Sequence, residues 1–174
     1  MLSSDNITLR PLEETDAPAI AALANNYHIW RYVRDRLPHP YSLSDAASFI
    51  QFARSESPAL NFAIVYNQSL AGVTGLTLQQ DIHRLNAEVG YWIGEPFWNK
   101  GIATKAVELI TDYAFNTLHL HRLFAGVFHT NPASGKVLSK AGYTLECTAR
   151  QAVIKEGKLL DEHRYVKLNT RPSM

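Results

Sequence analysis

The spacing of hydrophobic and polar residues changes several times along the chain, and each change marks the boundary of a predicted element. Alternation of apolar and polar residues is typical of a strand that buries one face against a core. It predicts strands over residues 7–10, 61–66, 70–78, 88–93, 122–128, 143–153 and 159–168. The segment Asn67-Gln68-Ser69 reads as a turn that joins the second and third of these strands into a hairpin.

Other segments place apolar residues every three or four positions, which is the spacing of a helix with one buried face. Ala106, Leu109, Ile110 and Tyr113 form such a stripe in the longest of them. The pattern predicts helices from a cap at Thr15 or Asp16 to Ala24, over 27–33, from a cap at Ser44 to near Pro58, over 101–118 and over 132–141. Strands and helices mixed in this order predict an α/β or α+β sheet with helices on both faces.

Composition narrows the class of protein further. Of the 174 residues, 46% are hydrophobic and 19% are charged, so we expect a single domain over 1–174 with its core at about 7–168. Lys plus Arg is 17 and Asp plus Glu is 16, and this balance argues against nucleic acid or a membrane surface as partner. One cysteine, Cys147, allows no internal disulfide, and no signal peptide or membrane span is evident. We therefore expect a cytoplasmic protein.

Candidate chemistry is concentrated where the strand at 88–93 leads into the long helix. A helix start leaves backbone N–H groups unpaired and carries partial positive charge, which suits a phosphate. Gly101 and Ala103 leave room there, while Lys100 and Thr104 offer a charge and a hydroxyl. The alternative is an ordinary strand-to-helix turn. The segment is neither a P-loop nor a three-glycine dinucleotide motif, so another type of phosphate carrier is needed.

Three segments, taken in order, carry a more specific pattern. They are Gly90-Tyr91-Trp92-Ile93 with Phe97-Trp98-Asn99-Lys100-Gly101-Ile102-Ala103-Thr104-Lys105-Ala106, then Asn131-Pro132-Ala133-Ser134 with Leu138-Ser139-Lys140-Ala141-Gly142-Tyr143, and finally Gly157 with Asp161 and Tyr165. Together they resemble the GNAT acetyltransferases, in the version of the RimJ/RimL-type protein N-acetyltransferases. The resemblance implies the GNAT fold, a mixed, twisted sheet splayed open at its middle and flanked by helices.

The same resemblance implies acetyl-coenzyme A as co-substrate, lying in the gap between the strands at 88–93 and 122–128, and it implies no metal. The pantetheine arm is expected along the first strand and the diphosphate at the helix start. The expected cofactor-binding residues are Tyr91, Trp92, Ile93, Trp98, Asn99, Lys100, Gly101, Ile102, Ala103, Thr104, Asn131, Ser134 and Lys140.

Direct transfer to an amine needs a base, because an α-amine with a pKa near 8 and a lysine amine near 10.4 are mostly protonated at pH 7. Glu88 starts the cofactor strand and is the candidate base, directly or through a water, unless it is a solvated strand-end residue. The glutamate that many family members carry on the strand after the long helix corresponds to Gly126 here. A backbone N–H near Trp92 or Ile93 would stabilise the oxyanion.

The acid that protonates the leaving thiolate is harder to place. The tyrosine that often serves in the family corresponds to Leu138 here, which leaves Ser134 as the nearest hydroxyl. Ser134 would act as the acid, bind the cofactor, or cap the last helix together with Asn131.

The acceptor side is the least diagnostic part of the sequence. An aromatic and basic cluster begins in the predicted helix at 27–33 and continues into the loop at 35–41, which we expect to form a wall of the acceptor site. Trp30, Tyr41 and His129 are expected to bind substrate. By resemblance the acceptor is a protein N-terminal α-amine. The alternatives are a small amine such as a polyamine, an amino acid or an antibiotic, and a non-catalytic acyl-CoA sensor. A homodimer is expected only because dimers are common among soluble enzymes.

Overall fold

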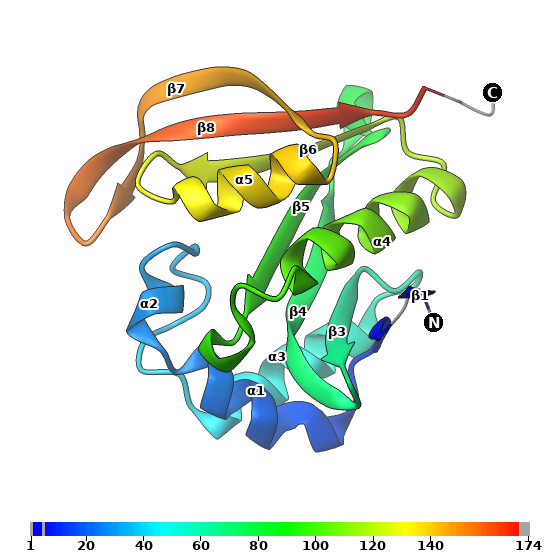
Figure 1. Cartoon of the computed structure of the whole chain (residues 1–174), viewed down its shortest axis with the longest axis vertical. Coiled ribbons are helices and arrows are strands. Elements are labelled where there is room, and N and C mark those ends of the chain that lie inside the picture. Colours follow the sequence, from blue (N-terminus) through cyan, green and yellow to red (C-terminus); the bar gives the residue numbers. More distant parts are fainter. Residues whose placement is uncertain (1, 5, 171–174) are drawn as a thin grey trace.

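The computed structural model describes residues 2–4 and 6–170. Its centre is an eight-stranded sheet in the order β1-β2-β3-β4-β5-β6-β8-β7 (Figure 1). The strands are β1 (Leu2–Ser4), β2 (Ile7–Pro11), β3 (Asn61–Tyr66), β4 (Ser69–Leu78), β5 (Asn86–Ile93), β6 (Arg122–Phe128), β7 (Thr144–Lys155) and β8 (Lys158–Leu168). All neighbouring strands are antiparallel except β5 and β6, so the sheet is mixed, as the sequence predicted.

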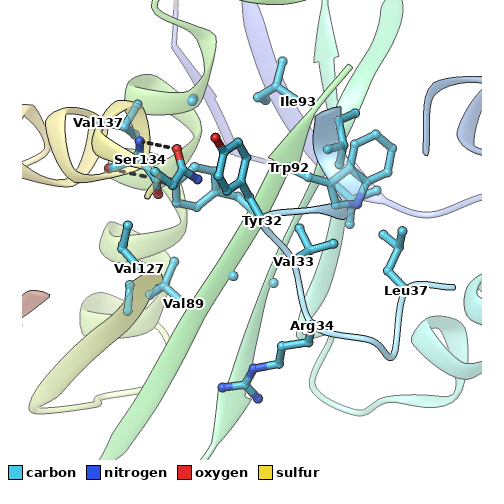
Figure 2. A pocket seen from close by; sticks show the side chains of 18 of the residues that line it. Tyr32, Val33, Arg34, Leu37, Val89, Trp92, Ile93, Val127, Ser134 and Val137 are labelled. Carbon is cyan, nitrogen blue, oxygen red and sulfur yellow. Dashed lines mark hydrogen bonds between the residues drawn. The ribbon is translucent and has the colours of Figure 1, made fainter. Parts of the chain in front are cut away.

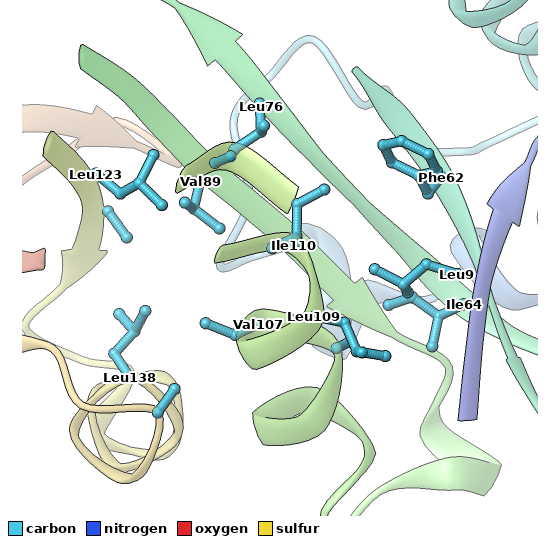
Figure 3. Packing of buried hydrophobic residues seen from close by; sticks show 14 of the residues in the cluster. Leu9, Phe62, Ile64, Leu76, Val89, Val107, Leu109, Ile110, Leu123 and Leu138 are labelled. Carbon is cyan, nitrogen blue, oxygen red and sulfur yellow. The ribbon is translucent and has the colours of Figure 1, made fainter. Parts of the chain in front are cut away.

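Helices cover both faces of the sheet, and each face has its own apolar cluster. On one face lie α1 (Ala17–Ala24), α2 (Tyr27–Trp30) and α3 (Leu43–Ser55); on the other lie α4 (Ile102–Asn116) and α5 (Pro132–Lys140). Short 3-10 turns, η1 (Glu14–Asp16), η2 (Asp81–His83) and η3 (Glu95–Phe97), complete the path. Figure 3 shows the larger cluster, in which α4 and α5 meet the sheet through Val107, Leu109, Ile110, Leu138, Leu9, Ile64, Leu76, Val89 and Leu123.

The sheet is open at its middle because β5 and β6 diverge. Their parallel pairing is limited to Asn86 with Arg122, Ala87 with Leu123 and Glu88 with Phe124. Beyond these three pairs β5 stays with β4, while β6 continues against β8. The splayed sheet that the sequence predicted is therefore present, and the gap between β5 and β6 lies at the start of α4.

Several predicted boundaries were wrong. The second helix ends at Trp30 rather than at residue 33, and α3 is capped by Ser42 rather than by Ser44. The Ser42 side chain accepts a hydrogen bond from Asp45 N–H, and Asp45 in turn accepts from Ser42 N–H, so a reciprocal capping box fixes the helix start. The strand β1 was not predicted, since three residues are too short to show alternation.

An ion pair fixes the start of α1 against β2. Both guanidinium nitrogens of Arg10 donate to the carboxylate of Asp16 at 2.7 Å, and Glu13 N–H donates to the same carboxylate at 2.8 Å. Burial alone would raise the pKa of Asp16, but these hydrogen bonds outweigh it and hold the pKa below its usual value.

We expect Asp16→Asn to lower the free energy of unfolding at pH 7 by about 2 kcal/mol, because a charged hydrogen-bonded pair is lost. A lowered pKa stabilises the fold at pH values above the aspartate pKa of the unfolded chain, near 3.9, and this contribution is lost as the pH falls through the folded-state value. The difference between the two proteins in urea unfolding should therefore be full at pH 7 and shrink in acid. Equal stabilities at pH 7 would show that the pair contributes nothing.

None of the helices within the described residues is long and apolar enough to cross a lipid bilayer.

Candidate active site

A cavity of 1280 Å³ lies between the diverging strands β5 and β6. It is bordered by β5, the start of α4, the start of α5 and the segment after α2. Figure 2 shows Ser134 and Val137 of α5 on one side, Leu37 on the other, and Val89 and Trp92 of β5 between them. All the residues expected to contact the cofactor line this cavity: Tyr91, Trp92, Ile93, Trp98, Asn99, Lys100, Gly101, Ile102, Ala103, Thr104, Asn131, Ser134 and Lys140.

The start of α4 faces the cavity with its backbone exposed. Gly101 is the residue before the first helical turn, with a φ of 76°, and a Cβ built there would meet nothing within 4 Å. The side chain of Ile102 is buried in the core, so Ile102 can offer only its backbone to a ligand. The indole N–H of Trp98 donates to Ile93 C=O at 2.7 Å, which ties this segment to the end of β5. Free N–H groups and open space make the helix start suitable for a diphosphate.

The edge of β5 that faces the gap carries the N–H groups of alternate residues. Gly94 N–H donates to Ala71 C=O on β4 at 2.8 Å, and the carbonyl oxygen of Trp92 also faces β4. Both backbone groups of a residue in an antiparallel ladder point to the same side, so Trp92 N–H is directed toward β4. Of the two expected oxyanion donors, Trp92 is therefore excluded because its N–H faces β4, and Ile93 remains. Tyr91, which also faces the gap, is a further candidate that the sequence did not indicate.

Ser134 is joined to a hydroxyl that the sequence did not single out. The Ser134 and Tyr91 hydroxyls are 2.7 Å apart, and Asn131 caps α5 by accepting from Ser134 N–H at 3.3 Å. Burial raises the pKa of Tyr91 to about 12, although the hydrogen bond with Ser134 lowers it in part. Tyr91 thus stays protonated at neutral pH. Leu138, at the position of the family's tyrosine, is completely buried in the core and contributes no hydroxyl.

The expected base, Glu88, already accepts a hydrogen bond from another side chain of the protein. Arg34, from the segment after α2, donates to Oε1 of Glu88 at 2.5 Å. The Arg34 side chain is 59% exposed and that of Glu88 is 18% exposed, so the pair lies at the mouth of the cavity.

A second carboxylate lies nearby and was missed from the sequence: Glu162 of β8 also borders the cavity, next to Gly126 of β6. Only the pairing of β6 with β8 brings these two residues together, and no local pattern gives that register.

The three residues expected to bind the acceptor have different surroundings. Tyr41 borders the cavity, but its side chain belongs to the apolar cluster beneath α1 and α3, and burial raises its pKa to about 12. Trp30 does not border the cavity, because its ring stacks on His39 at a centroid distance of 5.5 Å. His129 is also outside the cavity lining, since its Nδ1 lies against the backbone N–H of Asp161 at 3.2 Å. The structure therefore gives Trp30 and His129 no place in the cavity wall.

The turn between β7 and β8 contacts the region around α2. Lys155 pairs with Asp35 at 2.6 Å and lies 3.8 Å from the centre of the Trp30 ring, and the Tyr27 hydroxyl donates to Glu156 at 2.9 Å. The side chain of Lys155 is only 3% exposed. We call this set of contacting residues the clasp; it consists of Tyr27, Trp30, Asp35, Lys155 and Glu156. Beneath it lies a smaller cavity of 340 Å³.

Within the residues that the structure describes, no group of three or more His, Cys, Asp or Glu side chains could hold a metal ion.

Comparison with known proteins adds a family assignment to this geometry. Residues 6–144 match the model of the acetyltransferase (GNAT) domain. The uncharacterized N-acetyltransferase YoaA of Bacillus subtilis is 32% identical over 170 residues, which are 95% of this chain and 94% of YoaA. The spermidine N(1)-acetyltransferase of Escherichia coli is 31% identical over 150 residues, or 84% of this chain and 77% of that enzyme. A solved structure of RimL, a ribosomal L7/L12 alpha-N-protein acetyltransferase in complex with coenzyme A, has a TM-score of 0.84, covers 95% of both chains and is 22% identical.

Proposed function

Because the chain belongs to the GNAT acetyltransferase family, we propose that it transfers an acetyl group from acetyl-CoA directly to the α-amine of a peptide or protein N-terminus. Membership of this family identifies the chain as an N-acetyltransferase, which is a type of acyltransferase. The observation that carries the proposal is the cavity between β5 and β6, which is lined both by the start of α4 and by the carboxylates of Glu88 and Glu162.

The residues present fit acetyl-CoA. The start of α4, around Gly101, supplies N–H groups for the diphosphate, and the open space above Gly101 leaves room for it. The gap-facing backbone of β5 at Tyr91 and Ile93 supplies donors and acceptors for the amides of the pantetheine arm. When bound, acetyl-CoA supplies the activated acyl group as a thioester.

The chain must supply three groups for the transfer: a base, a hydrogen-bond donor for the oxyanion and an acid. A base takes a proton from the acceptor ammonium, which is the main form of an α-amine at pH 7. The N–H of Tyr91 or Ile93 donates to the oxygen on which negative charge develops as the amine attacks. The hydroxyl of Ser134 donates a proton to the departing sulfur and is held in place by Tyr91, whose own proton is retained at neutral pH.

We expect Ser134→Ala to lower kcat by roughly tenfold to a hundredfold, because the acid is lost while bound water serves poorly in its place. The dissociation constant of acetyl-CoA should change little, since the backbone contacts at Gly101 and on β5 remain. Steady-state kinetics together with calorimetry would measure both quantities. An unchanged kcat would show that Ser134 is not the acid and that its role is limited to the first turn of α5.

The charges at the mouth favour an α-amine over a polyamine. Arg34 is exposed there, and Arg36 also lines the cavity and is exposed. The carboxylate of Glu88 offsets the charge of Arg34, so it is mainly Arg36 that would repel the further positive charges of a polyamine, whereas a peptide N-terminus carries carbonyl oxygens that both guanidinium groups can bind. The spermidine enzyme among the relatives supports the small-amine alternative, and the structural likeness to RimL supports the fold alone.

The acceptor class can be tested by the release of coenzyme A thiol against matched panels. One panel contains short peptide amides with free N-termini, and each has a control peptide with a blocked N-terminus. The other contains spermidine, spermine and aminoglycosides. We expect turnover with the free peptides and little with the blocked ones. Faster turnover with the polyamines than with any peptide would overturn the acceptor assignment.

A further inference from the structure

The carboxylate of Glu162 fills the space that a side chain on β6 would otherwise take. A Cβ built on Gly126 would lie 2.6 Å from Oε2 and 2.7 Å from Cδ of Glu162. In the register of β6 with β8, Gly126 is opposite Arg164 and Phe128 is opposite Glu162, so the two residues are diagonal neighbours. The missing side chain at Gly126 allows Glu162 to reach across β6 toward the gap.

The same carboxylate has little to pair with inside the protein. Its side chain is 17% exposed, and the nearest cation, Nη2 of Arg164, is 3.9 Å from Oε1, which is too long for a hydrogen bond. Within residues 2–4 and 6–170 no hydrogen bond to the Glu162 carboxylate is formed. Glu88, by contrast, accepts a hydrogen bond from Arg34. A partly buried carboxylate without a donor is costly, and a bound ammonium would offset that cost.

Glu162 also lines both cavities. It borders the main cavity, where Ser134 and the gap-facing edge of β5 lie, and the smaller cavity beneath the clasp. The residues shared by both cavities are Val33, Arg34, Asp35, Phe128 and Glu162. An acceptor whose chain occupies the smaller cavity would therefore present its amine next to Glu162 as it enters the gap.

We propose that Glu162, and not Glu88, binds the acceptor ammonium and takes its proton. This inference rests on the proposed function and assigns the base for it. One N–H proton passes to an oxygen of Glu162, and the freed electron pair forms the C–N bond with the thioester carbonyl carbon. The C–S bond then breaks with its electron pair on sulfur, which takes a proton from Ser134. The second N–H proton and the proton on Glu162 leave, one restoring the Ser134 hydroxyl and the other passing to water.

Glu162→Gln keeps the shape of the side chain and removes both its charge and its basicity. With a peptide amide as acceptor, we expect kcat/KM to fall by roughly a hundredfold at pH 6.5, in the range for loss of a general base. At pH 9 the loss should be smaller, because an α-amine with a pKa near 8 then arrives mostly deprotonated. Glu88→Gln should lower the rate less, and Glu146→Gln, on the exposed face of β7, is the matched control that should leave it unchanged.

Moving the carboxylate between strands tests its position rather than its mere presence. In Glu162→Ala the activity should fall as in Glu162→Gln, and adding Gly126→Asp to this variant should restore part of it, because the new carboxylate stands where that of Glu162 was. Thermal unfolding of each variant shows whether a loss of activity is a loss of fold.

Binding gives a reading that does not need turnover. Calorimetric titration of the alanyl-alanine amide onto the complex with coenzyme A should give at least a tenfold weaker affinity for Glu162→Gln than for the unmodified protein at pH 6.5. Equal affinities, no binding to either protein, or equal pH profiles would overturn the role of Glu162. Failure of the unmodified protein to acetylate any amine, with binding still dependent on Glu162, would instead overturn the proposed function and retain the ammonium site.

Discussion

Gly101→Val should weaken the binding of acetyl-CoA by well over tenfold, which corresponds to more than about 1.4 kcal/mol. Two effects add. The φ of Gly101 is 76°, a conformation that costs a residue with a side chain about 1–2 kcal/mol and a β-branched one more. The new side chain would also project into the open space at the start of α4, where the diphosphate is expected. Calorimetric titration with acetyl-CoA measures the change.

Gly157→Val is the matched control for backbone strain. Gly157 lies in the turn between β7 and β8 with a φ of 72°, and a Cβ there would also meet nothing within 4 Å. Both variants should therefore lose a similar amount of stability, but only Gly101→Val should lose affinity for acetyl-CoA. Equal affinities of the two variants would show that the start of α4 does not hold the cofactor.

Gly72→Ala should destabilise the fold most among substitutions of a single methyl group. A Cβ on Gly72 would lie 2.1 Å from the carbonyl oxygen of Trp92 and 3.0 Å from Cα of Ile93, and both are backbone atoms of β5 that cannot rotate away. The strands β4 and β5 must therefore move apart. We expect the free energy of unfolding to fall by about 3 kcal/mol, which is at the upper end of the usual cost of overpacking. For a chain of this size that lowers the melting temperature by roughly 6–12 °C.

Gly90→Ala provides the comparison in the same pair of strands. A Cβ on Gly90 meets nothing within 4 Å, so its effect on the free energy of unfolding should stay within about 0.5 kcal/mol. Thermal unfolding followed by circular dichroism measures both variants. A melting temperature for Gly72→Ala equal to that of Gly90→Ala would contradict the close contact between β4 and β5.

The elements with a long periodic pattern were predicted well from the sequence, and short ones were not. The stripe on α4 and the alternation in β6 each extend over enough residues to be unambiguous, and the mixed sheet followed from their order. The end of α2 was misplaced because Tyr32 and Val33 continue an apolar pattern after the helix has stopped at Trp30. Ser42 and Ser44 are equally suitable caps by residue type, and only the hydrogen bond from Asp45 N–H distinguishes them.

The cofactor side of the site was more predictable than the acceptor side for a physical reason. The expected diphosphate segment is one continuous stretch identified by resemblance, so its residues from Trp98 to Thr104 had to lie together, and they do line the cavity; their binding of a diphosphate stays a prediction. Glu162 enters the site through strand pairing across β6 and β8, and Arg34 reaches Glu88 from 54 positions away. Such contacts depend on register and on the path of a loop, which local patterns do not encode.

The most direct test of acetyl transfer in this cavity is to incubate the protein with acetyl-CoA, with and without a peptide amide that has a free N-terminus. The thiol released and the acetylated peptide are then both quantified, the second by mass spectrometry. We predict equal amounts of thiol and of peptide carrying one acetyl group on its α-amine, and little thiol without the peptide. Binding of acetyl-CoA with no thiol released in the presence of any amine would contradict the enzymatic role and indicate a domain that only binds the thioester.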